Sequence, residues 1–394
     1  MTKKQQRDVD NREDIHKALA HIGNESLDNT ITKGVMGGLE HIATSSQLRD
    51  QGLEIPKRCI HCDVGMGQKQ STRQANSPHQ IQPLGPGTAI SADVIGPMRP
   101  SINGNTLMVV VMCMTTKYMY VRGLKHQRDM HIEFERYRAL MKNRDIKHDR
   151  VHIGLSKMVT DSAKNLIGEM MQVWQRDHFI TDWQSAPYSQ NQNMVESKIK
   201  SLFGKGIANL NTSGFPFFMA QHMIQMACNA MNNIWVKAIN TSPMFARFGI
   251  KGNAKHFFPP GSRMHCYKSE ELRAKGETHI DVLYYCGRPQ NGGGVIGFCP
   301  KRVTVYVRRH VNIDKRLFYG DYVGSRLEEK LAMHKQAREW SEADTKAYLD
   351  DRYRGQVLEE IMRAGLANQS KEEENPKLQK DKRSNRLADT EGTT

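Results

Sequence analysis

An uninterrupted apolar run, Leu107–Met114, constrains the fold more than any other feature of the sequence. A run of this kind is typical of a buried β-strand. Thr88–Ile95 alternates apolar and polar residues up to the break at Gly96-Pro97, and Tyr118–Val121 follows the apolar run after a short turn. Both segments carry strand signals. We therefore expect a sheet built around the apolar run.

Helical spacing after these strands predicts that the sheet is flanked by helices. Helices are expected over residues 129–143, 163–177, 195–211 and 217–235, with a fourth strand over residues 152–159. This order of strands, helix, strand and helices fits an α/β fold with a mixed sheet flanked by helices. It is the plan of RNase H-like nucleases.

Composition changes along the chain divide it into six expected segments. Residues 71–86 are rich in Ser, Gln, Pro and Gly, which is typical of a linker. Short strands around Gly292-Gly-Gly suggest a small β-barrel. The expected segments are a disordered polar head (1–12), a helical module ending in a cysteine pair (13–70), the linker (71–86), the α/β core (87–256), the barrel (257–325) and a charged helical or disordered tail (326–394).

The charge of the chain favours a polyanionic partner. Lys and Arg number 57 against 42 Asp and Glu, a formal charge of +15. Such a surplus is typical of nucleic-acid binding, because each cation set against a phosphate releases a condensed counterion. The alternative is a charge that serves solubility alone. The seven scattered cysteines do not resemble a secreted disulfide framework, and no apolar run reaches the length of a membrane span, so an intracellular protein is expected.

Two histidines and a Cys-x-x-Cys pair predict a structural zinc site. His16 and His21 precede Cys59 and Cys62, and two imidazoles with two thiolates suit Zn²⁺. The histidines are five residues apart, so they cannot share one face of a straight helix, and His21 is expected at the helix end. Ordinary thiols and surface histidines are the alternative, and His41 and His61 are rival ligands.

Three acids stand where a metal-dependent nuclease would need them. Asp93 lies within an apolar strand, where a charge is costly unless it is paired or binds metal. Asp161 follows a predicted strand, and Glu196 begins a predicted helix. Three carboxylates of this kind can hold two Mg²⁺ or Mn²⁺ ions for an in-line displacement at phosphorus. A lone Asp at a strand end is more often a cap or a surface charge, so the prediction depends on the three acids together.

These motifs, in this order, resemble the integrases of copia-type LTR retrotransposons, which belong to the retroviral integrase superfamily. The resemblance covers about residues 13–320. It is carried by the His/Cys set, Asp93-Val-Ile-Gly-Pro, Thr160-Asp161-Ser-Ala-Lys-Asn, Ser185-Ala-Pro-Tyr188, Gln192-Asn-Met-Val-Glu196, Thr241-Ser-Pro-Met-Phe-Ala-Arg-Phe-Gly249 and Val295–Asp314.

The resemblance implies an enzyme that joins cDNA 3′ ends of the element to target DNA. Asp93, Asp161 and Glu196 would hold the two catalytic ions, with one Zn²⁺ in the amino-terminal module. Tyr188, Gln192, Lys198, Lys200 and Lys205 are candidate DNA-binding residues. For the lysines the alternative is a salt bridge on the helix face, and for Tyr188 an ordinary loop position. The family also implies a homo-multimer, DNA as partner, and a nuclear site of action after assembly in a cytoplasmic virus-like particle.

Three departures from the family pattern keep other functions open. Ser162-Ala163 stands where Asn-Gly is usual, Asn193 stands in place of a glycine, and 34 residues separate Asp161 from Glu196, one fewer than usual. The metal ligands are intact. One alternative is a decayed or domesticated copy that binds DNA without joining it. Another is a different RNase H-fold nuclease, which would not need the zinc module.

Overall fold

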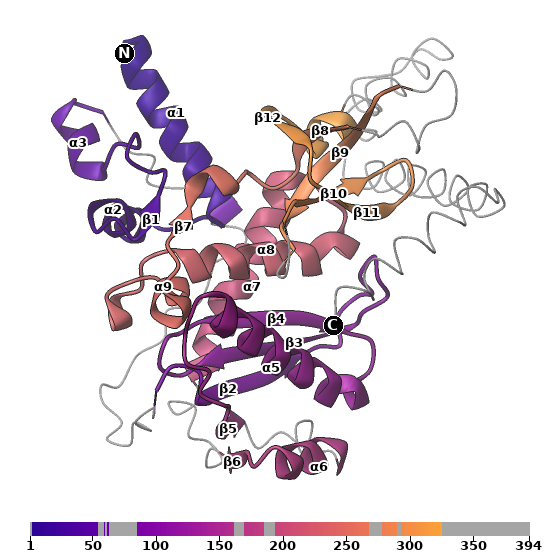
Figure 1. The fold of residues 1–394 in the computed structure, drawn as a ribbon. Helices are drawn as coiled ribbons and strands as arrows, with labels where there is room; N and C mark the ends of the chain where they lie inside the picture. The colour runs from indigo at the N-terminus through magenta and orange to yellow at the C-terminus, as the bar shows by residue number, and fades with distance from the viewer. Residues whose placement is uncertain are drawn as a thin grey trace. The chain divides into compact units, whose positions relative to one another are not determined.

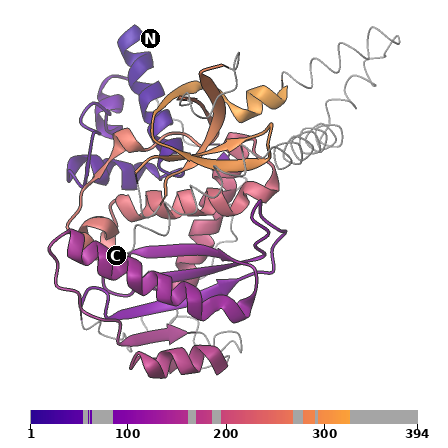
Figure 2. The same ribbon diagram turned by 45° about the vertical axis from the view of Figure 1, so that its right-hand side comes forward.

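The structure, a computed structural model, describes residues 2–53, 59, 61–62, 85–160, 169–184, 194–267, 278–289 and 293–324 (Figures 1 and 2). The chain divides into two compact units. One comprises Met1–Gly261 with Cys286–Gly292, and the other Ser262–Tyr285 with Gly293–Thr394. Among the described helices, none has the length and apolar character needed to cross a membrane. The expected linker, apart from its last two residues, and the expected tail lie outside the described residues.

A five-stranded mixed sheet forms the centre of the larger unit, as predicted. Its strands lie in the order β4-β3-β2-β5-β6. The neighbours β2, β3 and β4 are antiparallel, whereas β5 runs parallel to both β2 and β6. The strands are β2 (Ala89–Ile95), β3 (Leu107–Cys113), β4 (Met119–Leu124), β5 (Lys157–Thr160) and β6 (Thr181–Gln184).

Helices cover both faces of this sheet, which explains why β3 is apolar throughout. Met108, Val110 and Met112 of β3 join a core that includes residues of α8, whereas the alternate residues of β3 join a second core with α5, α6 and α9. Successive side chains of a strand point to opposite faces, so both sets are buried. The helices are α5 (Met130–Lys147), α6 (Glu169–Asp177), α7 (Met194–Ser213), α8 (Ala220–Asn233) and α9 (Pro243–Phe248) (Figure 2). The 3₁₀ turns are η1 (Gln127–Asp129), η3 (Phe217–Met219), η4 (Lys237–Ile239) and η5 (Ala254–His256).

A buried ion pair fixes α9 against α5. Arg247 of α9 donates to both carboxylate oxygens of Asp145, over 2.6 and 2.8 Å. Both side chains are almost completely buried. Gly87 lies against the guanidinium, and a Cβ there would come within 2.9 Å of it. The two-point geometry satisfies the charges that burial would otherwise leave uncompensated.

The amino-terminal module comprises α1 (Lys3–Ala18), α2 (Asn24–Thr32), β1 (Met36–Gly37) and α3 (Ser45–Asp50). Its apolar residues, among them Leu19, Leu27 and Leu39, belong to the same buried cluster as the α8-facing side of β3. Strand β1 also pairs in parallel with β7 (Gly252–Asn253), beyond α9. The module and the sheet therefore share one core within the larger unit.

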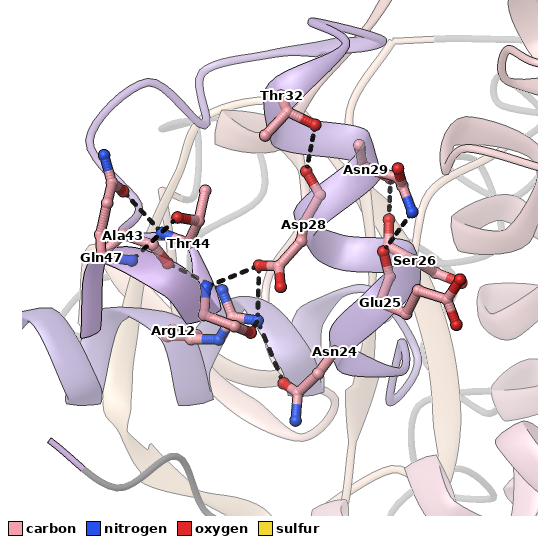
Figure 3. Close-up of polar contacts among 12 residues, drawn as sticks. Arg12, Asn24, Glu25, Ser26, Asp28, Asn29, Thr32, Ala43, Thr44 and Gln47 are labelled. Atoms are coloured by element: carbon pink, nitrogen blue, oxygen red, sulfur yellow. Dashed lines mark hydrogen bonds and ion pairs between the residues drawn. The ribbon is translucent and has the colours of Figure 1, made fainter. Parts of the chain in front are cut away.

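The prediction that residues 1–12 form a disordered head is wrong for residues 3–12, which are helical. Thr2 and Gln5 form a capping box at the start of α1. Arg12 is buried, and its guanidinium contacts the Asp28 carboxylate at 2.9 Å and the Ala43 carbonyl at 2.8 Å (Figure 3). The sequence did not show this because the polar partners of α1 lie 16 and 31 positions further along the chain.

The smaller unit contains a five-stranded sheet with the order β11-β10-β9-β8-β12. Strands β8 and β12 pair in antiparallel fashion, with a shift of register between Asp314 and Phe318. The described edge strands β11 and β12 are not neighbours, so the predicted closed barrel is instead an open sheet. The strands are β8 (Ser262–Tyr267), β9 (Ile280–Gly287), β10 (Val295–Cys299), β11 (Thr304–Arg308) and β12 (Val311–Phe318).

Candidate metal centre

Four potential metal ligands converge in the amino-terminal module. They are His16, His21, Cys59 and Cys62, and their ligand atoms all lie within 4.8 Å of one another. His16 Nε2 is 3.2 Å from His21 Nδ1, and Cys62 Sγ is 3.4 Å from each of these nitrogens. Cys59 Sγ is 3.5 Å from His21 Nδ1.

These four separations are close to those expected between ligands on one zinc ion. With ordinary Zn–N and Zn–S bond lengths, two nitrogens on one zinc lie about 3.3 Å apart, and a nitrogen and a sulfur about 3.6 Å apart. The nitrogen–nitrogen separation of 3.2 Å and the three nitrogen–sulfur separations of 3.4 to 3.5 Å lie close to these values. Two thiolates also balance the charge of a divalent ion. The donor set and its spacing therefore fit Zn²⁺, as the sequence predicted.

A left-handed turn at the end of α1 brings the two histidines together. The helix ends at Ala18, and Ala20 and His21 then have φ of 55° and 57°. This backbone conformation is uncommon for residues other than glycine. It turns the His21 ring back toward His16, so that the ring centroids are 5.0 Å apart. His21 was predicted at the helix end, and it lies three residues beyond Ala18, the last residue of α1.

Each imidazole has a hydrogen-bond partner on the ring nitrogen that faces away from the other ligands. His16 Nδ1 donates to the Ile22 carbonyl over 2.9 Å, which leaves Nε2 as the ligand atom. His21 Nε2 lies 2.9 Å from Thr212 Oγ1 in α7. The Thr212 hydroxyl gives its own proton to the Ala208 carbonyl, so it accepts from His21 Nε2 and leaves Nδ1 unprotonated.

Burial keeps both imidazoles in the neutral form that binds metal. It lowers the pKa of His21 to about 3, helped by the neighbouring charge of His16. Burial also lowers the pKa of His16, against a smaller opposing effect of the Ile22 carbonyl. A neutral ring presents a lone pair to a cation at neutral pH without first losing a proton.

Lys205 is part of the surroundings of this centre, although the sequence suggested a DNA contact. Its side chain is buried, and its ammonium donates to the carbonyls of Ala20 and His21, each over 3.2 Å. Burial lowers the pKa of Lys205 to about 8, opposed by the charge of Cys62. The suggestion that Lys205 binds DNA phosphate is therefore wrong, because its ammonium is buried and donates to two carbonyls of the turn after α1.

The rival ligands are not members of the centre. His41 is exposed, and the described group of four ligands does not include it. The His61 ring lies edge-on to His21 with a centroid distance of 6.0 Å, and it too is outside the group.

The strand that carries Asp93, the strand that ends just before Asp161 and the helix that carries Glu196 lie next to each other. Asp93 is half-buried in β2, opposite Val110 of β3, and its Oδ1 accepts from the Val94 amide over 2.7 Å. Ala92 pairs with Thr160, the last residue of the parallel strand β5. Glu196 is in the first turn of α7, a helix that contacts β2 and β3. Asp161 and the side chain of Glu196 lie outside the described residues.

Of the remaining predicted DNA-binding residues, two lie among the described residues and two do not. Lys198 is half-buried and Lys200 is exposed, both on α7. Lys200 follows Glu196 by four residues, which is one helical turn. Tyr188 and Gln192 lie outside the described residues.

Sequence reasoning missed Thr212, the partner of the His21 ring. Thr212 lies 191 residues beyond His21, and a threonine near a helix end carries no distinguishing signal. No family model and no curated protein matches this chain. The case for the metal centre is its geometry: the donor set, the tetrahedral spacing and the oriented rings.

Proposed function

We propose that this protein is an RNase H-like DNA integrase that joins DNA 3′ ends to a target duplex. The resemblance of the motifs to copia-type retrotransposon integrases supports this reading, as do the zinc-type centre and the formal charge of +15. The strand order, with three antiparallel strands and two parallel ones, is also that expected of an RNase H-like core.

One observation carries the proposal: the register pair Ala92–Thr160. Each of these residues directly precedes one of the proposed catalytic acids, Asp93 in the central strand and Asp161 after β5. The carboxyl ends of parallel strands meet at one edge of a sheet. Glu196 begins a helix that contacts the strand of Asp93, which supports its place as the third acid.

The chemistry that follows is phosphoryl transfer assisted by divalent metal. Asp93, Asp161 and Glu196 would hold two Mg²⁺ or Mn²⁺ ions, which supply charge stabilisation and an activated oxygen at the phosphorus. Asp93 is suited to bind both ions because it lies in the central strand and its side chain is only partly buried. The 3′-hydroxyl of the element's cDNA would attack a phosphodiester of the target in line, and the 3′-oxygen of the cut target strand would leave; no covalent protein intermediate is required.

The other parts of the chain would bind DNA and further copies of the protein. The zinc module is proposed to have a structural role, and Lys198 and Lys200 to contact phosphate near the acids. By analogy with the family, the working form is a multimer holding two cDNA ends. Nuclear action, after assembly in a cytoplasmic particle, belongs to the same proposal.

The proposal is tested by strand transfer with the zinc-loaded full chain. Short duplexes with the terminal sequence of the element are incubated with target DNA and Mg²⁺ or Mn²⁺. We expect joined products from the wild type and none from Asp161→Asn. Asp149→Asn, which alters an exposed carboxylate of the same unit, is the matched control and should join normally.

Two other results would replace the proposal. DNA binding without joining in either metal would favour a decayed copy, for which Ser162-Ala163 is the first residue pair to revert to Asn-Gly. Cleavage of RNA–DNA hybrids or junctions without joining would favour a different nuclease of the same fold.

A further inference from the structure

The metal centre is not built from the amino-terminal module alone, because two side chains of α7 complete it. Thr212 contacts a ligand ring, and Lys205 binds the backbone of the turn that carries this ring. We propose that Thr212 and Lys205 are positioning residues of the metal centre, so that metal affinity depends on α7 and metal binding in turn stabilises α7.

Thr212 fixes the protonation pattern of His21. Its hydroxyl lies 2.9 Å from His21 Nε2 and is oriented by its own bond to the Ala208 carbonyl, also 2.9 Å. With Nε2 protonated, the lone pair of Nδ1 points to Cys59, Cys62 and His16. Such outer partners of metal-bound histidines typically change metal affinity 10- to 100-fold when removed.

Lys205 holds the left-handed turn from the other side. The carbonyls of Ala20 and His21 both accept from its ammonium, and these are the two residues with positive φ. Buried carbonyls without a donor are unfavourable, so the lysine stabilises a backbone conformation that His21 does not readily adopt. The turn is the feature that brings the two histidines within ligand distance of each other.

The dependence must be reciprocal. If α7 raises the affinity of the centre for metal, bound metal raises the stability of α7 in its docked position by the same factor. The shared core extends this coupling, since Leu202 of α7 is buried in the same cluster as Leu19 and Ile22 beside the centre. If Glu196 is a catalytic ligand, as proposed above, zinc occupancy also stabilises the helix in which it lies.

Zinc affinity, measured by competition with a chelating dye, tests the role of Thr212 without any assay of activity. We expect Thr212→Val to weaken zinc binding about tenfold. Thr212→Ser keeps the hydroxyl and should bind within about twofold of wild type. Thr32→Val is the matched control, since Thr32 makes the same type of bond to the carbonyl of residue 28 but is an exposed residue of α2. Wild-type affinity in Thr212→Val, or equal loss in Thr212→Ser, would overturn the role of Thr212.

Two further measurements test Lys205 and the reciprocal effect. Lys205→Met should also weaken zinc binding about tenfold, whereas Lys200→Met, at an exposed position of the same helix, should not. Hydrogen exchange of the wild-type chain should slow in residues 205–213 when zinc is added. Unchanged exchange in this segment, under conditions where zinc binds, would contradict the coupling even if Lys205→Met does not fold.

Discussion

The two candidate metal sites of the larger unit differ in how their ligands are held. At the His/Cys centre, each imidazole has an orienting partner on its second nitrogen, and the rings are largely buried. Asp93 instead projects from the middle of β2, is half-exposed, and accepts from the amide of its own neighbour.

Under the proposed function, this difference would separate a structural metal site from a catalytic one. Structural zinc sites are closed by four protein ligands, whereas catalytic sites leave positions open for water and substrate. The His/Cys set offers four protein ligands, enough to close such a site. A half-buried carboxylate such as that of Asp93 could hold an exchangeable ion that also binds substrate oxygen. The first two predictions below test this distinction, and the other two separate it from effects of residues outside both sites.

Metal removal from the His/Cys centre should have the largest effect. Apparent binding free energies of structural zinc are on the order of 10 kcal/mol, and they contribute to folding. We expect a chelator, or Cys62→Ser, to lower the free energy of unfolding by several kcal/mol. Denaturant unfolding with and without zinc measures this. Identical curves would show that the centre holds no structural ion.

Asp93→Asn should abolish joining while leaving the fold intact. Loss of a metal-binding carboxylate should reduce strand transfer by at least about a thousandfold, equivalent to about 4 kcal/mol of barrier. The amide retains an oxygen for the Val94 N–H, so the free energy of unfolding should change by less than about 1 kcal/mol. A large loss of stability in this variant would assign Asp93 to the structure instead.

Arg12→Met should destabilise the module next to the metal centre by about 3 kcal/mol. Arg12 is buried and also donates to Ser45 Oγ over 2.8 Å, so its removal leaves Asp28 and a carbonyl without their main donor. Arg49→Met, at an exposed position of α3, is the control. Urea unfolding of the zinc-loaded chains measures the difference. Equal stability of the two variants would refute this role of Arg12.

His222 should produce the smallest effect, an acid-dependent loss of stability unrelated to either metal site. Burial lowers its pKa to about 4, and its ring nitrogens have no hydrogen-bond partner among the described residues. As the pH falls below about 6.5, the unfolded chain gains a proton that the folded chain takes up only near pH 4, so stability falls across this window.

The full pKa shift of His222 corresponds to a loss of about 3 kcal/mol in the free energy of unfolding. We expect a loss of about 2 kcal/mol, because part of the His222 side chain contacts solvent. Unfolding at several pH values should give a shallower acid slope for His222→Leu than for wild type. His41→Leu, at an exposed position, should keep the wild-type slope. An unchanged slope in His222→Leu would leave the metal centre as the source of acid sensitivity.

Much of the sheet could be predicted because its signals are local. The apolar run became β3, and the helix expected over residues 195–211 became α7 at Met194–Ser213. The strand expected over residues 152–159 is shorter, Lys157–Thr160, because its first residues do not join the ladder with β2. The helix expected over residues 217–235 is divided into a 3₁₀ turn and α8.

The parts that could not be predicted depend on partners far apart in sequence. The ligand types and their spacing identified the metal centre, but Thr212 and Lys205 are recognisable only once α7 lies beside the turn after α1. The helical start of the chain was missed because Arg12 reads as a surface charge until Asp28 and Ser45 surround it. Whether the edge strands β11 and β12 pair decides between a barrel and an open sheet, and no local sequence pattern predicts that pairing.

The most direct test of the distinction between the two sites is the zinc content of the chain by native mass spectrometry, after dialysis against excess Mg²⁺. The account predicts one tightly held zinc per chain in wild type and in Asp93→Asn, and none in Cys62→Ser. Loss of zinc from wild type under Mg²⁺, or retention of zinc by Cys62→Ser, would contradict a closed structural site separate from the carboxylates.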